Sequence, residues 1–403
     1  MHTVGAICEY NPFHTGHARQ LAEIRRRFGA DAAVVCAMSG NFVQRGDFAV
    51  VRKQARAEAA ILGGADLVLE LPLPWATDSA EGFARGGVGV LNATGVVDTL
   101  AFGSECADTE RLARAADALL SDEFSASLKK ELAKGCSFAA ARRRAAQTLL
   151  GADAACLDEP NDILGVEYCK ALRTLKSRIE PLALRRAGAA HDGDRAADGY
   201  ASASHIRRLL IAGGDAKAFL TPDMARLIEA ERTAGRAPVH IANAERAILA
   251  RLRVATEDEL AAFDGGGEGL YHRLYDAARA ATGVEQLLGA AKTKRYAHAR
   301  LRRLLLAAYL GVTPEMRRGT PPYIRVLAMN DRGISLLHDM RGSAALPLLV
   351  KPARAGELGE AARRLMELEA RATDLYALAY PALSQSAGGG EWRSSPAVIN
   401  GGG

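Results

Sequence analysis

The chain has 403 residues and a net charge of +5, and 49% of its residues are apolar. This length is more than one ordinary core needs, so we expect two domains. No apolar run reaches the roughly 18 residues of a membrane span, and the start "MHTVGAICEY" lacks the pattern of a secretion signal. We therefore expect a soluble protein of the cytoplasm, without membrane contact.

Apolar runs alternate with helical patterns over the first third of the chain. Strands are predicted at residues 3–8, 31–39, 65–73 and 97–105, and helices at 17–29 and 52–64. This alternation predicts βαβ crossovers and a parallel sheet, so the fold class is α/β and Rossmann-like. Ligands of such sheets bind beyond the carboxyl ends of the strands. The loops after these strands are therefore expected to line one pocket.

The remaining chain is mostly helical by periodicity. Helical patterns cover residues 109–150 and 158–175, a strand is predicted at 179–188, and a helix follows at 202–214. We expect a catalytic α/β domain at 1–212 and a mainly helical domain at 213–382, with short strands near 324–331 and 346–351. The last residues, 383–403, are rich in Gly and Ser, which predicts a disordered tail.

The six cysteines are scattered, and no two of them form a CxxC pair. This spacing argues against a zinc knuckle and against a disulfide framework. We expect most of them to be small buried apolar groups, and we predict no metal site. They are Cys8, Cys36, Cys106, Cys136, Cys156 and Cys169.

Two histidines stand where the first strand gives way to a helix. His14 and His17 are three residues apart, so on a helix they share one face. The free N–H groups of a helix start attract anions, imidazoles add donors there, and Gly16 lets a ligand approach the backbone. Fixed donors are the main catalytic resource in nucleotidyl transfer. His14 and His17 are therefore the predicted catalytic pair, against the alternatives of a metal-ligand pair or a coincidence.

The motif "HTGH" looks like the HxGH signature of nucleotidyltransferases and class I aminoacyl-tRNA synthetases. A longer series of motifs follows in order over residues 1 to about 335: "GAICEYNPFHTGH", "MSGNFVQRGDFAVV", "GADLVLELPLPWA", "FGSE", "EPNDILGVEYCKAL", "SASHIR", "KTKRYAHARLRR" and "PPYIRVLAMN". Together these motifs resemble the tRNA(Met) cytidine acetate ligase family. Two positions depart from the family pattern: Arg52 stands where we expect an acidic residue, and Asp162 where a second Asn is common.

The resemblance implies a nucleotidyltransferase domain of the HIGH superfamily followed by a tRNA-binding domain. It implies activation of acetate by ATP to acetyl-adenylate, then acetyl transfer to N4 of the wobble cytidine of elongator tRNA(Met). ATP is then a co-substrate carrying Mg²⁺ on its phosphates, the partners are tRNA(Met) and acetate, and no stable protein partner is predicted.

The resemblance also implies which residues bind ATP. These are Ile7, Cys8, Glu9, Tyr10, Asn11, Pro12, Phe13, His14, Thr15, Gly16, His17, Ala18, Arg19, Gln20, Gly103, Asn161 and Arg186. "SASHIR" resembles a phosphate-gripping element and places Ser202, Ser204 and Arg207 near the pyrophosphate. Simpler interpretations are a turn glycine at 103, helix caps at 161, 202 and 204, and exposed arginines at 186 and 207.

A basic segment at residues 292–303 carries six Lys or Arg and no acid. We predict that Lys292, Lys294, Arg295 and Arg300 contact tRNA, with Tyr296 and His298 available for stacking on bases. The alternative is a solvated helix face.

The loop "SGNFVQRG" follows the second strand, and its Gln44 and Arg45 could reach acetate or the adenylate. No role is assigned to either. Two other functions stay open from the sequence: a small-molecule adenylyltransferase, and an RNA-binding factor without catalysis on the same fold.

Overall fold

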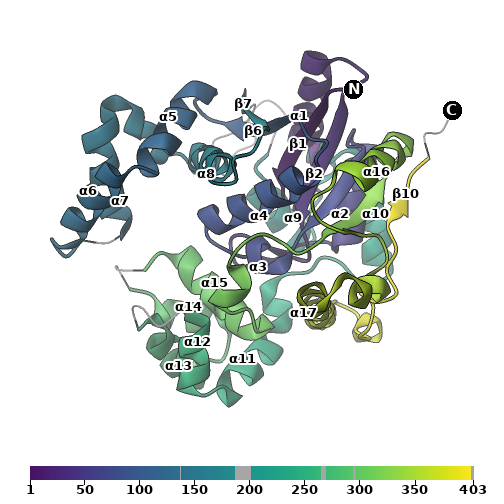
Figure 1. The fold of residues 1–403 in the computed structure, drawn as a ribbon. Helices are drawn as coiled ribbons and strands as arrows, with labels where there is room; N and C mark the ends of the chain where they lie inside the picture. The colour runs from purple at the N-terminus through teal and green to yellow at the C-terminus, as the bar shows by residue number, and fades with distance from the viewer. Residues whose placement is uncertain (137, 187–200, 265–268, 294–295, 401–403) are drawn as a thin grey trace.

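The computed structural model describes residues 1–136, 138–186, 201–264, 269–293 and 296–400 (Figure 1). Its centre is an eight-stranded sheet in the order β10-β8-β5-β2-β1-β6-β7, with β9 beside β8, and a separate hairpin of β3 and β4. The strands are β1 (Thr3–Cys8), β2 (Ala33–Ser39), β3 (Phe42–Val43), β4 (Asp47–Phe48), β5 (Leu67–Leu71), β6 (Thr99–Ser104), β7 (Glu180–Arg185), β8 (Ile324–Met329), β9 (Leu348–Leu349) and β10 (Ala397–Val398).

The five N-terminal strands of this sheet are parallel, as the alternating pattern predicts. The chain runs from β1 outward to β2 and β5, then crosses back to β6 and β7 on the other side of β1. The strand order therefore reverses between β1 and β6. Open α/β sheets bind ligands outside the carboxyl ends of the strands at such a point. The predicted α/β fold is confirmed.

Both faces of the sheet are buried, which explains the continuous apolar runs. Successive residues of β2 alternate between two apolar cores: Val34 and Cys36 join one, and Val35 and Ala37 join the other. The first core contains side chains of α1 (Thr15–Phe28), α2 (Lys53–Leu62), α9 (Ala203–Ile211) and α10 (Pro222–Thr233). The second contains α4 (Ala80–Ala93), α8 (Pro160–Thr174) and the C-terminal helices.

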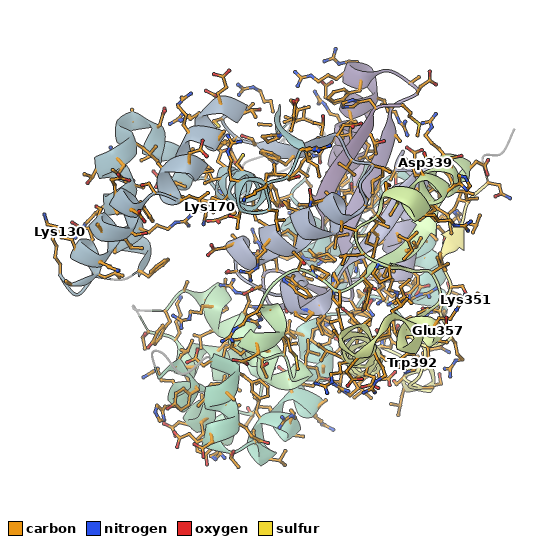
Figure 2. The ribbon with its side chains drawn as sticks, in the orientation of Figure 1. Lys130, Lys170, Asp339, Lys351, Glu357 and Trp392 are labelled. Carbon is orange, nitrogen blue, oxygen red and sulfur yellow. The ribbon has the colours of Figure 1, made fainter. Side chains whose placement is uncertain are left out.

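Three helices between β6 and α8 extend away from the sheet as an arm (Figure 1). They are α5 (Thr109–Leu119), α6 (Asp122–Leu132) and α7 (Phe138–Leu150). Figure 2 shows Lys130 of α6 at the outer end of this arm. The helical pattern predicted within residues 109–150 is thus confirmed as three helices.

The C-terminal part contains a helical group and segments that return to the sheet (Figure 1). The helical group comprises α11 (Glu245–Val254), α12 (Glu257–Asp264), α13 (Leu270–Ala280), α14 (Val284–Ala291) and α15 (His298–Leu310). After it, β8 pairs antiparallel with β5, and α16 (Asp331–Ser343), β9 and α17 (Glu360–Ala377) follow. The short strands predicted near 324–331 and 346–351 are confirmed, but the sheet includes chain from both sides of the predicted boundary at residue 212.

The prediction of a disordered tail is wrong for the described residues 383–400. Strand β10 pairs in parallel with β8, and Glu391 is completely buried. The Glu391 carboxylate lies 2.9 Å from Lys53 Nζ and pairs with Arg325. Tertiary ion pairs therefore order a segment whose Gly- and Ser-rich composition predicts disorder. Among the described residues, no helix is both long and apolar enough to cross a membrane.

Candidate active site

A cavity of about 810 Å³ opens where the strand order reverses. It is lined by the chain leaving β1, by the ends of β6 and β7, and by residues at the starts of α1, α8 and α9. Of the predicted residues, those that line it are Ile7, Cys8, Glu9, Tyr10, Asn11, His14, Gly16, His17, Arg19, Gln20, Gly103, Asn161, Arg186, Ser202, Ser204 and Arg207. Residues distant in the sequence, including Gln44 and Arg45, therefore meet around one space.

The two histidines stack on each other at the start of α1, with ring centroids 3.7 Å apart. His14 is the N-cap residue, and its Nδ1 accepts the Gly16 N–H at 3.1 Å. His17 Nδ1 accepts the N–H of His14 at 3.3 Å. Because each Nδ1 accepts a hydrogen bond, the proton of each neutral ring is on Nε2. Both Nε2–H groups are then donors for an anion at the helix start.

The environment keeps both rings neutral. Burial, followed by the charges of Arg186 and Arg207, lowers the pKa of His14 to about 4. Burial, followed by His14 and Arg186, lowers the pKa of His17 well below its ordinary value. The pair can therefore offer hydrogen-bond donors, but not a fixed positive charge, near pH 7.

Gly16 has a steric reason to be glycine besides access for a ligand. A Cβ at this position would lie 2.9 Å from Cε1 of the His14 ring. A side chain would thus push the capping imidazole out of position. The geometry of the helix cap therefore explains why a glycine stands between the two histidines of the HxGH motif.

Four residues of the predicted ATP-binding run 7–20 are not among those that line the cavity. Pro12 follows a cis peptide bond, Phe13 is fully buried, Thr15 donates its hydroxyl to the carbonyl of Phe219, and Ala18 packs against the apolar core. Their positions indicate that they shape the loop and hold α1.

The segment "SASHIR" begins α9 and lines the same cavity as the two histidines. Ser202 is the N-cap, and its hydroxyl accepts the N–H of His205 at 3.2 Å. Arg207 donates to the Ser204 hydroxyl at 3.2 Å and to the Asn11 carbonyl at 2.8 Å. The simpler interpretation of Ser202 as a cap is confirmed, but Arg207 lies in the cavity wall and not on a solvated face.

Gly103 and Arg186 meet at the ends of β6 and β7. A Cβ on Gly103 would lie 3.0 Å from Cγ of Arg186, so the absence of a side chain at Gly103 leaves room for the aliphatic part of Arg186.

Asn161 does not cap α8, because the N-cap residue is Glu159. The Asn161 amide instead donates to the Glu105 carboxylate at 2.5 Å. The interpretation of Asn161 as a helix cap is therefore wrong.

The loop that carries Gln44 and Arg45 is fixed at both ends. The Gln44 N–H donates to the Glu9 carboxylate at 2.7 Å. Gly46 has φ +73°, and a Cβ there would lie 2.6 Å from the backbone carbonyl carbon of Arg302 in α15. The loop thus bridges the cavity and the helix of the basic segment.

Sequence reasoning missed a buried arginine that organises these loops. Arg56 is fully buried in α2 and donates to the carbonyls of Val51 and Glu9 at 2.9 and 2.5 Å, and to those of Ser39 and Gly40. It thereby holds the ends of β1 and β2 together. Its only signal in the sequence is a cation placed between the alanines Ala55 and Ala57 of α2.

The fold places the residues of the basic segment in different environments, some exposed and some in the core. Lys292 is exposed and Arg300 is partly exposed, whereas Lys294 and Arg295 lie outside the described residues. Tyr296 is only 7% exposed and packs in the core, so the prediction that it stacks on bases is wrong. Arg302 pairs with Asp47 at 2.9 Å.

In the part of the chain that the structure describes, no three side chains come together as metal ligands.

Comparisons with known proteins agree with this geometry. Residues 1–390 match the model of the HIGH nucleotidyl transferase family. The tRNA(Met) cytidine acetate ligases of Acetivibrio thermocellus and of Caldanaerobacter subterraneus subsp. tengcongensis are both 37% identical to the chain. Each alignment covers 94% of this chain, and 95% and 96% of the respective relatives.

Two crystal structures of Thermotoga maritima TmcAL are similar over nearly the whole chain. The apo form has a TM-score of 0.94, and the form bound with alpha-thio ATP has a TM-score of 0.92. Both are 33% identical and cover 99% of this chain and 100% of theirs. The chain therefore belongs to the HIGH nucleotidyl transferase family and, within it, to the tRNA(Met) cytidine acetate ligases.

Proposed function

We propose that the protein uses ATP to activate acetate and transfers the acetyl group to N4 of the wobble cytidine of elongator tRNA(Met). The observation that carries this proposal is the neutral imidazole pair at the start of α1, inside a cavity where the strand order reverses. Two relatives named tRNA(Met) cytidine acetate ligase and an ATP-analogue complex of a structural neighbour support it.

In the first step, a carboxylate oxygen of acetate attacks the α-phosphorus of ATP. The bond from this phosphorus to the bridging oxygen breaks, and pyrophosphate leaves with the electron pair. His14 and His17 would donate their Nε2–H groups to the phosphoryl oxygens, where negative charge grows. The helix start adds backbone donors, and Ser204 and Arg207 would hold the departing pyrophosphate. Mg²⁺ would be bound chiefly through the phosphates of ATP.

In the second step, the N4 amine of cytidine attacks the acetyl carbonyl carbon of acetyl-adenylate. The bond from this carbon to the AMP oxygen breaks, AMP leaves, and the amine loses one proton. A mixed anhydride supplies the leaving group that acetate itself lacks. No covalent enzyme intermediate is needed.

We assign ATP binding to residues 1–212 and tRNA binding mainly to residues 213–382. Exposed Lys292 and partly exposed Arg300 are the described residues of the basic segment that would contact phosphates of tRNA. Arg302 has a different task, because its ion pair with Asp47 joins α15 to the loop of Gln44 and Arg45. Function on tRNA implies the cytoplasm as the location.

Incubation with ATP, labelled acetate and tRNA tests the proposal. We expect N4-acetylcytidine, AMP and pyrophosphate in equal amounts. Adenylyl transfer to a small acceptor without acetylation of tRNA would favour an adenylyltransferase instead. Binding of tRNA without nucleotide turnover would favour an RNA-binding factor.

A further inference from the structure

Glu105 follows β6 and lies behind the cavity wall. It is not among the residues that line the cavity, and its side chain is 25% exposed. One carboxylate oxygen accepts the Asn161 amide at 2.5 Å and lies 3.7 Å from an Arg186 nitrogen. The other accepts the backbone N–H of Asp162 at 3.0 Å. A single carboxylate thus contacts two predicted ATP-binding residues and the first turn of α8.

The carboxylate of Asp162 holds the same loop from the opposite direction. It accepts the Ser104 hydroxyl at 2.5 Å, the Glu105 N–H at 2.9 Å and the Cys106 N–H at 3.2 Å. Asp162 is 1% exposed. The loop after β6 and the start of α8, which lie beside each other in Figure 1, are therefore cross-linked by reciprocal side-chain to backbone hydrogen bonds. This network leaves Glu105 little freedom to move.

The fixed carboxylate determines how Asn161 is oriented. A carboxylate only accepts hydrogen bonds, so the amide of Asn161 must turn its NH₂ group toward Glu105. The amide oxygen then points away from Glu105. Because Asn161 lines the cavity, this oxygen is an acceptor available to a ligand there.

We propose that Glu105 is a positioning residue that fixes the amide of Asn161 so that its oxygen accepts a hydrogen bond from the nucleoside of ATP. This inference rests on the proposed binding of ATP in the cavity. The ligand donor is the 6-amino group of adenine or a hydroxyl of ribose. Guanine presents an oxygen in place of that amino group, so a contact with adenine would also reject GTP.

Binding of nucleotides to the full chain, measured by titration calorimetry, tests the role of Glu105. The ligands are ATP, purine riboside triphosphate without the amino group, and 2′-deoxy- and 3′-deoxy-ATP. We expect wild type to prefer ATP over one of these analogues by about tenfold, because one net hydrogen bond contributes about 1 to 1.5 kcal/mol. The analogue that loses affinity identifies the donor.

Glu105→Gln should weaken ATP binding by about tenfold and reduce that preference to within about twofold, because a glutamine amide no longer dictates the orientation of Asn161. Glu110→Gln, an exposed change on the neighbouring α5, is the control and should retain wild-type values. A Glu105→Gln protein that keeps the wild-type preference would overturn the inference.

Asn161→Ala provides a second test, which also serves if Glu105→Gln does not fold. It should abolish the same preference, and Glu105→Gln should add little to it in the double variant. Wild-type preference in Asn161→Ala would overturn the inference. These affinities do not depend on acetyl transfer, so absence of N4-acetylcytidine in the assay of the proposed function would contradict that function separately.

Discussion

Two groups of ionisable side chains in this chain differ in how their charges are matched. The first is the buried cluster of Lys53, Glu70, Arg325 and Glu391, in which each side chain is at most 2% exposed. It has two positive and two negative groups in mutual contact. Although burial alone would raise the pKa of Glu391, Lys53 and Arg325 lower it to about 2. The charges of this cluster therefore balance one another without a ligand.

The second group surrounds the cavity, which among the described residues is lined by six arginines and two glutamates. The neutral histidines add donors to this excess of positive charge. The excess positive charge of this site is balanced only when an anion binds. The difference teaches that a charge cluster in this chain stabilises the fold where it is buried and neutral in itself. A partly exposed cluster with one sign of charge in excess points to a ligand.

The largest effect expected from this comparison is on stability. Glu391→Ala leaves Lys53 and Arg325 with one remaining carboxylate partner, Glu70, and should lower the free energy of unfolding by about 3–5 kcal/mol. Urea denaturation measures this loss. Glu357, labelled in Figure 2, forms an exposed ion pair with Arg354, so Glu357→Ala is the control and should cost at most about 1 kcal/mol. Equal costs for the two variants would contradict the role of the buried cluster.

Near pH 7, loss of an imidazole should affect turnover and not stability. His14→Asn and His17→Asn should each reduce acetyl transfer by about 10²–10³, because a donor to the growing charge is lost. Asparagine at position 14 still supplies the helix cap, so the fold should persist. His338→Asn, an exposed change on α16, is the control. Unchanged turnover, or a matching loss of tRNA affinity, would refute the assigned role.

The neutral histidines also predict a pH dependence of stability. Their pKa values are lowered in the folded protein, so the unfolded chain takes up protons first as the pH falls. Stability should decrease as the pH drops below about 6.5, and for His14 the decrease should continue to about pH 4. The unfolding free energy of a variant with asparagine at both positions should fall less over this range. Parallel curves for the two proteins would contradict the lowered pKa values.

The smallest expected effect concerns tRNA. Lys292→Ala combined with Arg300→Ala should weaken tRNA binding several-fold and reduce the slope of log affinity against log salt by about 1 to 2. The affinity for ATP should not change. Lys351→Ala, an exposed lysine labelled in Figure 2, serves as the control. An unchanged salt dependence would remove these residues from the tRNA surface.

The β1–α1 region could be predicted from the sequence because its geometry is local. The strand, the N-cap His14 and the donor His17 follow one another within fifteen residues, so the backbone itself brings them together. The central parallel strands were equally predictable, since β1 and β2 are nearly continuous apolar runs, as expected for strands covered on both faces.

The tail and the wall of the cavity depend on partners far away in the sequence. β10 has only two residues, and Glu391 gains its order from Lys53 and Arg325. Glu105 acts on Asn161 across 56 positions. In the basic segment, the charge pattern does not reveal that Tyr296 turns into the core. Such pairings are set by tertiary packing, which composition does not encode.

A crystal structure of this protein with a non-hydrolysable ATP analogue tests the central claim most directly. The account predicts phosphate oxygens within hydrogen-bonding distance of Nε2 of both His14 and His17, with the nucleoside toward Gly103 and Asn161. An analogue bound outside this cavity, or bound in it with its phosphates away from both imidazoles, would contradict the account.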